Sequence, residues 1–405
     1  MLIDELSRRA MGRADDLFTA DVEAHAAELD RRIRGARVLV VGGAGSIGAS
    51  TVKTLAQFRP RTLHVMDQSE NNLAELVRDL RSGSTFDVDD FRALPVDLGS
   101  SIARRFLDEA DGYEHVLNFA AMKHVRSEKD VCSTLQLLDT NVIKAVRFVE
   151  WIVELGVTTR YFCVSTDKAA NPVNLMGASK RLMEHVLFSD EVLSPGRLAV
   201  TSARFANVAF SDGGLLDAFL RRFDKGQPIS VPEGTRRYFI SLREAGQICM
   251  LAAILGPERH VLVPRLHAET HLIDLQTVAT EVVRSRGLEP RFYRAEGEAK
   301  ARVMADLAEG RYPVLLTPLD TSGEKPYEEF VGEGEHAIEV GLQSLLAVPY
   351  RPTAAGAVRD AVHELREIIE TPRRAIDKAT LVALLARAMP ELHHAETGRS
   401  LDERM

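Results

Sequence analysis

The chain has 405 residues, which allows two or three domains at roughly 150 residues each, and 45% of them are hydrophobic, so a sizeable core can form. Acidic residues outnumber basic ones, 59 to 51, and the net charge of −8 argues against a chain built mainly to coat nucleic acid or anionic lipid. Because Cys132, Cys163 and Cys249 form no CxxC pair, we expect no metal site and no disulfide framework, but buried thiols in a reducing cytoplasm.

The first half of the chain alternates between helical and strand patterns. Residues 1–35 are expected to be helical, because apolar residues from Val22 to Ile33 recur on one face, with Thr19 or Asp21 as the cap. Apolar runs then predict strands, each followed by a helical stretch, at 37–41, 62–66, 91–96, 115–119 and 160–165. This alternation predicts an α/β fold, a Rossmann-type doubly wound parallel sheet with helices on both faces.

The remaining chain predicts a smaller mixed α/β lobe and a helical end. Short strands, helices near 243–255 and 274–286, and several prolines follow residue 200. Near the end, Asp377 opens a helix that Pro390 closes. The longest apolar run, about residues 248–255, is too short for a membrane span. We therefore expect four segments: a helical extension 1–35, a Rossmann domain 36–200, a smaller substrate lobe 201–348 interleaved with it, and a helical extension 349–405.

A glycine-rich loop follows the first strand and opens a helix. Gly42, Gly45 and Gly48 recur at every third position. Such glycines permit a tight turn and a close approach to a pyrophosphate, whose charge the helix N-terminus favours, so Ser46 and Ile47 join the expected site. Asp67 ends the second strand, 19 residues beyond Gly48, where a carboxylate can hold both hydroxyls of an adenine ribose and repel a 2′-phosphate. We therefore expect NAD rather than NADP as cofactor.

Two further strand ends belong to this expected cofactor site. Asp97 ends the third strand, where it could meet the adenine amino group or simply cap the next helix. Asn118 to Ala121 end the fourth strand, and a small residue such as Ala120 would let the middle of the cofactor lie against the backbone.

A candidate chemical site follows the fifth strand, in the run Ser165-Thr166-Asp167-Lys168. Ligands of open α/β sheets bind at the carboxyl ends of the strands, so this turn faces the expected crevice. Adjacent aspartate and lysine can act as a proton donor and acceptor pair, although this dipeptide is also common in solvated turns. Met176 and Lys180 follow with the spacing M-x-x-x-K.

These motifs resemble the extended short-chain dehydrogenase/reductase family. Within it, the segments Ala120–Val125, Thr166–Arg181, Arg204–Val208 and Gly323–Lys325 are similar to nucleotide-sugar 4,6-dehydratases of polysaccharide biosynthesis that act on UDP-N-acetylglucosamine. The similarity covers about residues 36–345. Met176 stands where the wider superfamily has a tyrosine, and a thioether cannot exchange a proton, so a simple alcohol dehydrogenase or ordinary 4-epimerase is disfavoured.

The resemblance implies a redox-neutral loss of water from a UDP-linked sugar, with NAD accepting a hydride from C4 and returning it to C6. It assigns Asp167 as the acid, Lys168 as the base at C5, Thr166 to the C4 hydroxyl, and Lys180 to the nicotinamide ribose. The substrate-binding residues that it implies are Lys123, His124, Asn207, Arg237 (or Arg236) and Glu324. It also implies a homodimer or larger homo-oligomer, paired through the stretches near 133–155 and 178–190.

Two alternatives share this expected scaffold. One is a nucleotide-sugar 4-epimerase or reductase, against which the methionine at position 176 argues. The other is a non-catalytic NAD-binding regulator, against which the presence of Asp167, Lys168 and Lys180 argues.

Overall fold

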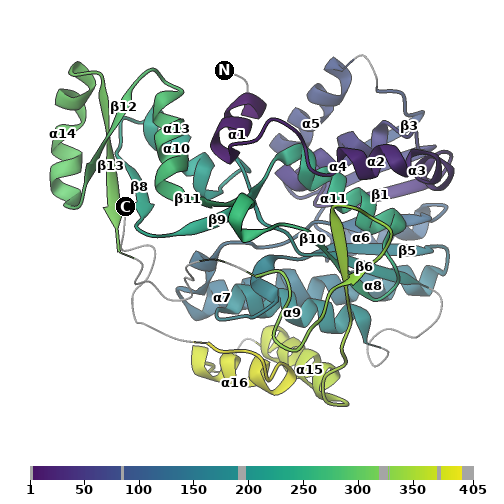
Figure 1. Ribbon diagram of the computed structural model, residues 1–405. Helices are drawn as coiled ribbons and strands as arrows, with labels where there is room; N and C mark the ends of the chain where they lie inside the picture. The colour runs from purple at the N-terminus through teal and green to yellow at the C-terminus, as the bar shows by residue number, and fades with distance from the viewer. Residues whose placement is uncertain are drawn as a thin grey trace.

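A nine-stranded sheet forms the centre of the molecule (Figure 1). The structure is a computed structural model, and it describes residues 3–83, 86–189, 198–318, 327, 329–371 and 375–394. The strand order is β14-β15-β10-β6-β5-β4-β1-β2-β3. The strands from β3 to β10 are parallel, whereas β15 runs antiparallel to β10, and β14 antiparallel to β15. The bounds are β1 (Arg37–Val41), β2 (Thr62–Asp67), β3 (Asp90–Pro95), β4 (His115–Asn118), β5 (Arg160–Val164), β6 (Ala199–Ala203), β10 (His260–Pro264), β14 (Ile338–Glu339) and β15 (Leu345–Pro349).

This sheet confirms the predicted Rossmann-type architecture. The strand order reverses between β1 and β4, which creates the crevice where doubly wound folds bind their ligands. Residues 38–41 of β1 are at most 1% exposed, because helices cover both faces of the sheet. One hydrophobic cluster lies between the sheet and α4 (Ser46–Ala56), α5 (Glu70–Ser82) and α11 (Leu242–Leu255). A second lies under α6 (Ser101–Glu109), α8 (Lys144–Leu155) and α9 (Leu175–Phe188).

The long helix expected around 133–155 contains an irregular turn. Helix α7 (Val131–Leu138) passes through a π-helical segment η2 (Asp139–Ile143) before it continues as α8. Single π turns inside α-helices are rare and frequently occur at functional sites, because they turn side chains away from the regular helical faces.

The smaller lobe stands beside the carboxyl end of the sheet, at the left of Figure 1. It contains two three-stranded sheets, built from β7 (Asn207–Val208), β9 (Arg236–Ile240) and β11 (Leu272–Asp274), and from β8 (Ile229–Pro232), β12 (Glu289–Tyr293) and β13 (Arg311–Thr317). Its helices are α10 (Leu215–Asp224), α12 (Ala268–His271), α13 (Leu275–Arg284) and α14 (Glu296–Ala308). Between these elements the chain returns to the large sheet through α11, β10, β14 and β15, so the lobe is interleaved with it.

The N-terminal extension forms three short helices, α1 (Ile3–Met11), α2 (Thr19–Ala24) and α3 (Ala26–Ile33). The expected cap is wrong: Phe18 precedes α2 and makes no side-chain cap, and Thr19 and Asp21 lie inside the helix. The buried carboxylate of Asp21 instead accepts the backbone N–H groups of Gln343 and Ser344, at 2.6 and 2.8 Å. Asp21 therefore fixes the extension to the loop before β15, a contact between distant segments that helix patterns do not reveal.

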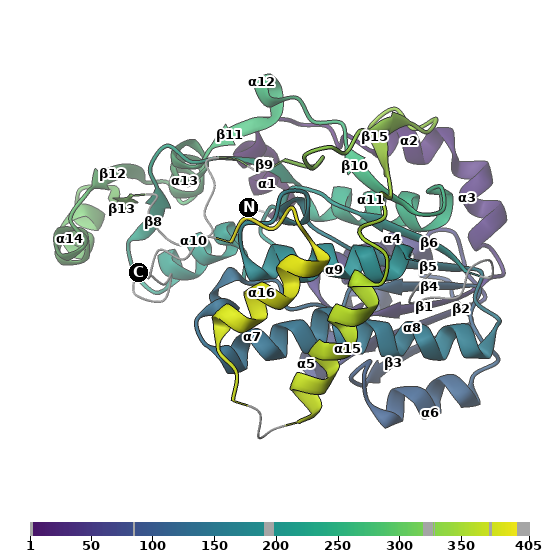
Figure 2. The ribbon, with the colours of Figure 1, turned by 90° about the horizontal axis from the view of Figure 1, so that it is seen from below.

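The C-terminal extension forms α15 (Ala357–Glu370) and α16 (Lys378–Ala388), which lie over α9 and η2 (Figure 2). As predicted, the Asp377 side chain caps α16 by accepting the Thr380 N–H at 2.8 Å. Leu365, Leu381 and Leu385 share a hydrophobic cluster with residues of α9. Every residue of α9 is buried, so residues 178–188 offer no open face for pairing with a second copy. The predicted oligomer stays a prediction.

Two further features bear on the expectations from sequence. Cys163 and Cys249 are buried as expected, but Cys132, near the start of α7, is exposed. Within the described ranges, no helix combines the length and the apolar character that a bilayer crossing requires.

Candidate functional site

The glycine loop between β1 and α4 packs tightly against the end of β4. Gly42 has a positive φ of 67°, and a side chain there would collide with the backbone of Ala120. A side chain at Gly48 would collide with the carbonyl of Gly42, so both positions require glycine. Gly45 precedes the first turn of α4, and no side chain caps this helix end. The first N–H groups of a helix have no acceptor within the helix, so an anion beside Gly45 would be stabilised there.

A cavity of about 480 Å³ extends from this loop along the ends of β1, β2, β3 and β4, and Gly42, Gly45, Asp67, Asp97 and Ala120 all line it. The carboxylate of Asp67 accepts the N–H groups of Ala44 and Ser69, at 3.0 and 2.9 Å, which fixes it beside the glycine loop. Both backbone bonds leave lone pairs of the carboxylate available to hydroxyl donors.

Asp97 lies at the far side of this cavity. Its carboxylate accepts the N–H of Gly99 at 2.8 Å and a hydrogen bond from Lys144 Nζ at 2.8 Å. Ser100, rather than Asp97, caps α6, so the alternative role as a helix cap is wrong. The structure thus brings both strand-end aspartates to one cavity, and their cofactor contacts stay predictions.

The turn after β5 brings two donor groups onto one carboxylate oxygen. In the 3₁₀ turn η3 (Asp167–Ala169), Asp167 is buried, and its Oδ1 accepts hydrogen bonds from Thr166 Oγ1 at 2.9 Å and from Lys168 Nζ at 3.1 Å. All three residues line a second cavity of about 310 Å³. A hydroxyl, a carboxylate and an ammonium within mutual reach can exchange protons with a ligand in that cavity.

Helix α9 forms the adjacent wall of this second cavity through Met176 and Lys180. Met176 is buried, and its backbone N–H donates to Glu128 Oε1 at 2.9 Å, in the 3₁₀ turn η1 (Val125–Glu128). Lys180 Nζ donates to the carbonyl of Val164 at 2.9 Å. Burial lowers the pKa of Lys180, an effect that the charges of Cys163 and Glu184 oppose.

The two cavities meet at the end of β4, where Phe119 and Ala121 line both. Ile47, in the first turn of α4, also lines the second cavity. Its neighbour Ser46 accepts the N–H of Asp212, in the smaller lobe, through Oγ at 2.9 Å. A dinucleotide that lies along the first cavity would thus present one end to the turn that holds Asp167.

The side of the second cavity toward the smaller lobe contains most of the expected substrate residues. Lys123, His124 and Asn207 line it, and Lys123 Nζ donates to the carbonyl of Asp212 at 2.6 Å. Arg237 does not line the cavity. However, Phe239 lines it, and side chains two residues apart in a strand point to the same face, so Arg237 lies on the face of β9 that Phe239 presents to the cavity. This alternation favours Arg237 over Arg236 as the ligand arginine. Glu324 lies outside the described residues.

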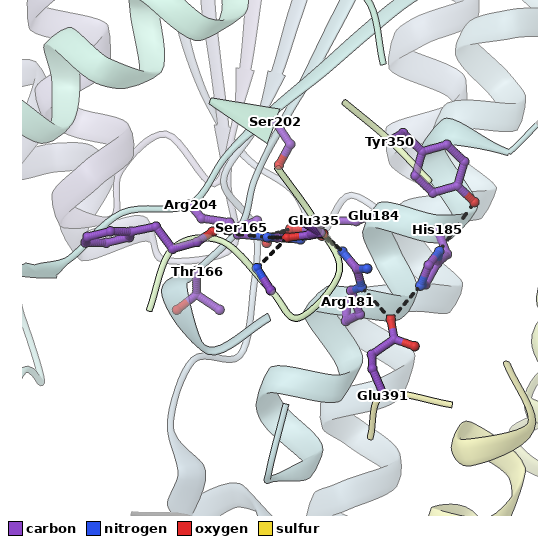
Figure 3. Close-up of polar contacts among 12 residues, drawn as sticks. Ser165, Thr166, Arg181, Glu184, His185, Ser202, Arg204, Glu335, Tyr350 and Glu391 are labelled. Atoms are coloured by element: carbon purple, nitrogen blue, oxygen red, sulfur yellow. Dashed lines mark hydrogen bonds and ion pairs between the residues drawn. The ribbon is translucent and has the colours of Figure 1, made fainter. Parts of the chain in front are cut away.

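Sequence reasoning missed the buried polar residues behind the turn that holds Asp167 (Figure 3). Ser165 lines the second cavity, and its Oγ donates to the buried Glu184 Oε1 at 2.6 Å. Glu184 in turn accepts Arg204 Nε at 2.8 Å and Nη2 at 2.6 Å, and both residues are buried. Glu184 stands four residues after Lys180, on the same helical face, and this spacing was the signal that could have revealed it.

Asn141, in the π segment η2, was also missed. Its side chain accepts the N–H of Met122 at 2.8 Å and donates to the carbonyl of Met122 at 2.9 Å. The same amide group donates to Ser179 Oγ at 2.8 Å, beside Lys180. Asn141 therefore holds the loop after β4 against α9. No local pattern marks such a residue, because the π turn that directs it inward follows from packing.

A family model described as "Polysaccharide biosynthesis protein" matches residues 38–349. The chain belongs to this family. It is 31% identical over 304 residues to MJ1061 of Methanocaldococcus jannaschii, described as an uncharacterized membrane protein, covering 74% of this chain and 81% of that relative. It is 26% identical to EpsC of Bacillus subtilis, a probable polysaccharide biosynthesis protein, over 83% of this chain. The match spans only 52% of EpsC, about half its length.

The chain is also similar to a curated enzyme whose name gives a nucleotide-sugar substrate. A UDP-glucose 4-epimerase of Rickettsia massiliae is 25% identical over 60% of this chain and 63% of the relative. Among solved structures, Pen from Bacillus thuringiensis superimposes with a TM-score of 0.63 at 20% identity, over 82% of this chain and 98% of that one. WbmF of Bordetella bronchiseptica, solved with NADH, gives a TM-score of 0.51 at 17% identity over 64% and 79%. These superpositions establish the shared fold.

Proposed function

We propose that the protein is an NAD-dependent nucleotide-sugar 4,6-dehydratase that converts UDP-N-acetylglucosamine, or a closely related sugar nucleotide, to its 4-keto-6-deoxy product. The observation that carries the proposal is the convergence of Thr166 and Lys168 on the Asp167 carboxylate, beside the dinucleotide cavity. Met176 occupies the wall where a tyrosine would be needed for the epimerase route, and it offers no exchangeable proton.

The first cavity fits NAD. Two obligatory glycines allow a pyrophosphate to approach the backbone at the start of α4, and Asp67 lies where the adenine ribose would bind. Lys180 would hold the nicotinamide ribose in the second cavity, which adjoins the first. The bound cofactor would supply a hydride acceptor for C4 of the sugar and return the hydride to C6.

The residues of the catalytic turn would manage the protons. Lys168 Nζ and Asp167 Oδ1 lie 3.1 Å apart, so one proton can pass between them. With that proton on Asp167, neutral Lys168 is a base that removes the C5 hydrogen, which a carbonyl at C4 makes acidic. Asp167 then protonates the C6 hydroxyl, which leaves as water. Transfer of the proton from Lys168 back to Asp167 would restore this pair. Oxidation at C4 releases the C4 hydroxyl proton to solvent, and one proton is taken up from solvent at C5 when the hydride returns to C6. One water is therefore released, and no proton is gained or lost overall.

A 4-epimerase is the second candidate, because a curated relative bears that name. The two candidates differ in the mass of the product. Incubation of the purified protein with UDP-N-acetylglucosamine, without added reductant, should yield a product that has lost one water, measured by mass spectrometry. Isomerisation without a mass change would establish the epimerase instead. Bound NAD without turnover of any nucleotide sugar would favour a regulator.

Replacing Asp67 with alanine should weaken NAD binding and leave the side chains of Thr166, Asp167 and Lys168 unchanged. Hydrogen bonds to a charged acceptor contribute about 1.5–3 kcal/mol, so the dissociation constant for NAD should rise by about tenfold or more. Calorimetric titration of the cofactor-free protein with NAD measures this rise. Asp87→Ala, which removes an exposed carboxylate outside the cavity, is the control and should bind like the wild type. An unchanged constant in Asp67→Ala would remove Asp67 from the cofactor site.

A further inference from the structure

We propose that the segment 389–394, which follows α16, is a positioning element of the catalytic turn, and that Glu391 is its central residue. The inference goes beyond the proposed chemistry, because none of the residues of the C-terminal extension that the structure describes lines either cavity. Two separate contacts carry it. One passes through a buried network of charged side chains, and the other passes through the backbone.

The first contact begins at the Glu391 carboxylate. Its Oε1 accepts Arg181 Nε at 2.8 Å and His185 Nε2 at 3.2 Å, both from α9 (Figure 3). Burial alone would raise the pKa of Glu391, but the bonds from His185 and Arg181 lower it to about 2. Glu391 is therefore ionised at neutral pH and attracts the Arg181 guanidinium.

Arg181 extends this contact to the catalytic turn. Its Nη1 donates to Glu184 Oε2 at 3.2 Å, and Oε1 of the same carboxylate accepts Ser165 Oγ at 2.6 Å. Three successive contacts thus join Glu391 to Ser165, the residue before Thr166. Arg181 and Glu184 are 10% and 1% exposed at their side chains, so little water competes for these bonds. Lys180 precedes Arg181 in α9, so the contacts that hold Arg181 also restrain the position of Lys180.

The second contact holds the chain between the catalytic turn and Met176. The N–H of His393 donates to the carbonyl of Pro172 at 3.0 Å, midway between Lys168 and Met176. His394 Nε2 lies 3.9 Å from Oε2 of Glu128, whose other oxygen accepts the N–H of Met176. The C-terminal segment thus contacts the stretch 168–176 at Pro172, in its middle, and reaches Met176, at its end, through Glu128.

The geometry of the proton-transferring pair depends on these anchors. Displacing a catalytic group by about 1 Å can lower the turnover rate by roughly a hundredfold. Ser165 and Pro172 flank Thr166, Asp167 and Lys168, so the Glu391 and His393 contacts restrain both ends of the turn. A residue that acts in this way changes kcat and leaves the binding of cofactor and substrate nearly intact.

The test uses the full-length protein with Glu391 changed to alanine or to glutamine. Glu391→Ala should lower kcat for water loss by about tenfold to a hundredfold, with KM values for sugar nucleotide and NAD changed less than about threefold. Glu391→Gln keeps an oxygen that accepts from Arg181, so it should recover part of the lost kcat. The matched control is Glu367→Ala, an exposed carboxylate on α15, which should behave as the wild type.

Because the kinetic arm rests on the proposed function, hydrogen–deuterium exchange provides an independent arm. The amides of residues 165–180 should exchange at least about tenfold faster in Glu391→Ala than in Glu367→Ala. If Glu391→Ala fails to fold, kcat and hydrogen–deuterium exchange are measured on Glu391→Gln instead, and both should change in the same direction by smaller amounts. Wild-type kcat together with unchanged exchange would overturn the inference. Faster exchange in a protein whose wild type releases no water would support the inference and reject the proposed function.

Discussion

Replacing Lys168 with alanine should lower kcat for water loss by about 10²- to 10⁴-fold, the usual contribution of a positioned acid or base. In the proposed mechanism, the variant lacks the amine that would take the C5 proton and return a proton to Asp167 across 3.1 Å. The side chain of Lys168 is 22% exposed and lies at a cavity wall, so its loss leaves no large void in the core. The expected result is an inactive protein that stays folded and binds NAD as the wild type does.

Two measurements separate this expectation from general damage. Circular dichroism and NAD titration should match the wild type, and Lys225→Ala, a change of an exposed lysine after α10, should retain full activity. Oxidation at C4 does not need the C5 base, so reduced cofactor should still appear on the variant when substrate is added, detected by its near-ultraviolet absorbance. Full activity of Lys168→Ala would show that another group removes the C5 proton.

The sequence predicted the sheet well, because each central strand is a continuous apolar run. Residues 37–41 and 62–66 are strands as expected, and their carboxyl ends place the glycine loop and Asp67 in one cavity. The local rule that strand ends of a parallel sheet face one crevice was sufficient for this part. The same rule placed Asp97, Thr166, Asp167 and Lys168 at two adjoining cavities.

The remaining part of the site depends on contacts between distant segments. Arg204 and Glu335 meet across 131 residues, and Arg181 and Glu391 across 210, so no window of sequence reveals their pairing. The burial of α9 was missed for the same reason: its outer face is apolar in Leu182 and Val186 because α15 and α16 cover it. From sequence alone, that apolar face was indistinguishable from a surface for a second copy.

Arg204→Met should destabilise the protein more than any other single change considered above. Arg204 is fully buried and donates five hydrogen bonds, to Glu184, to Glu335 and to the carbonyl of Phe330. Methionine fills similar volume but leaves two buried carboxylates with Arg181 as their shared guanidinium. Removing one partner of a buried ion pair costs about 3–5 kcal/mol, a large share of the roughly 5–15 kcal/mol that stabilises a domain.

Chemical denaturation at several pH values tests this expectation and its origin. Burial would raise the pKa of Glu335, but the hydrogen bonds and charge of Arg204 lower it to about 2. A lowered pKa stabilises the wild type fully above the ordinary value of 4.5, and this contribution is lost as the pH falls from there toward 2. The difference in stability between the wild type and Arg204→Met should therefore shrink progressively over that interval, as the Glu335 carboxylate becomes neutral. Arg78→Met, which removes an exposed guanidinium paired with Glu75, should change the unfolding free energy by less than about 0.5 kcal/mol. If Arg204→Met were as stable as that control at pH 7, the buried network would contribute little to the stability of the fold.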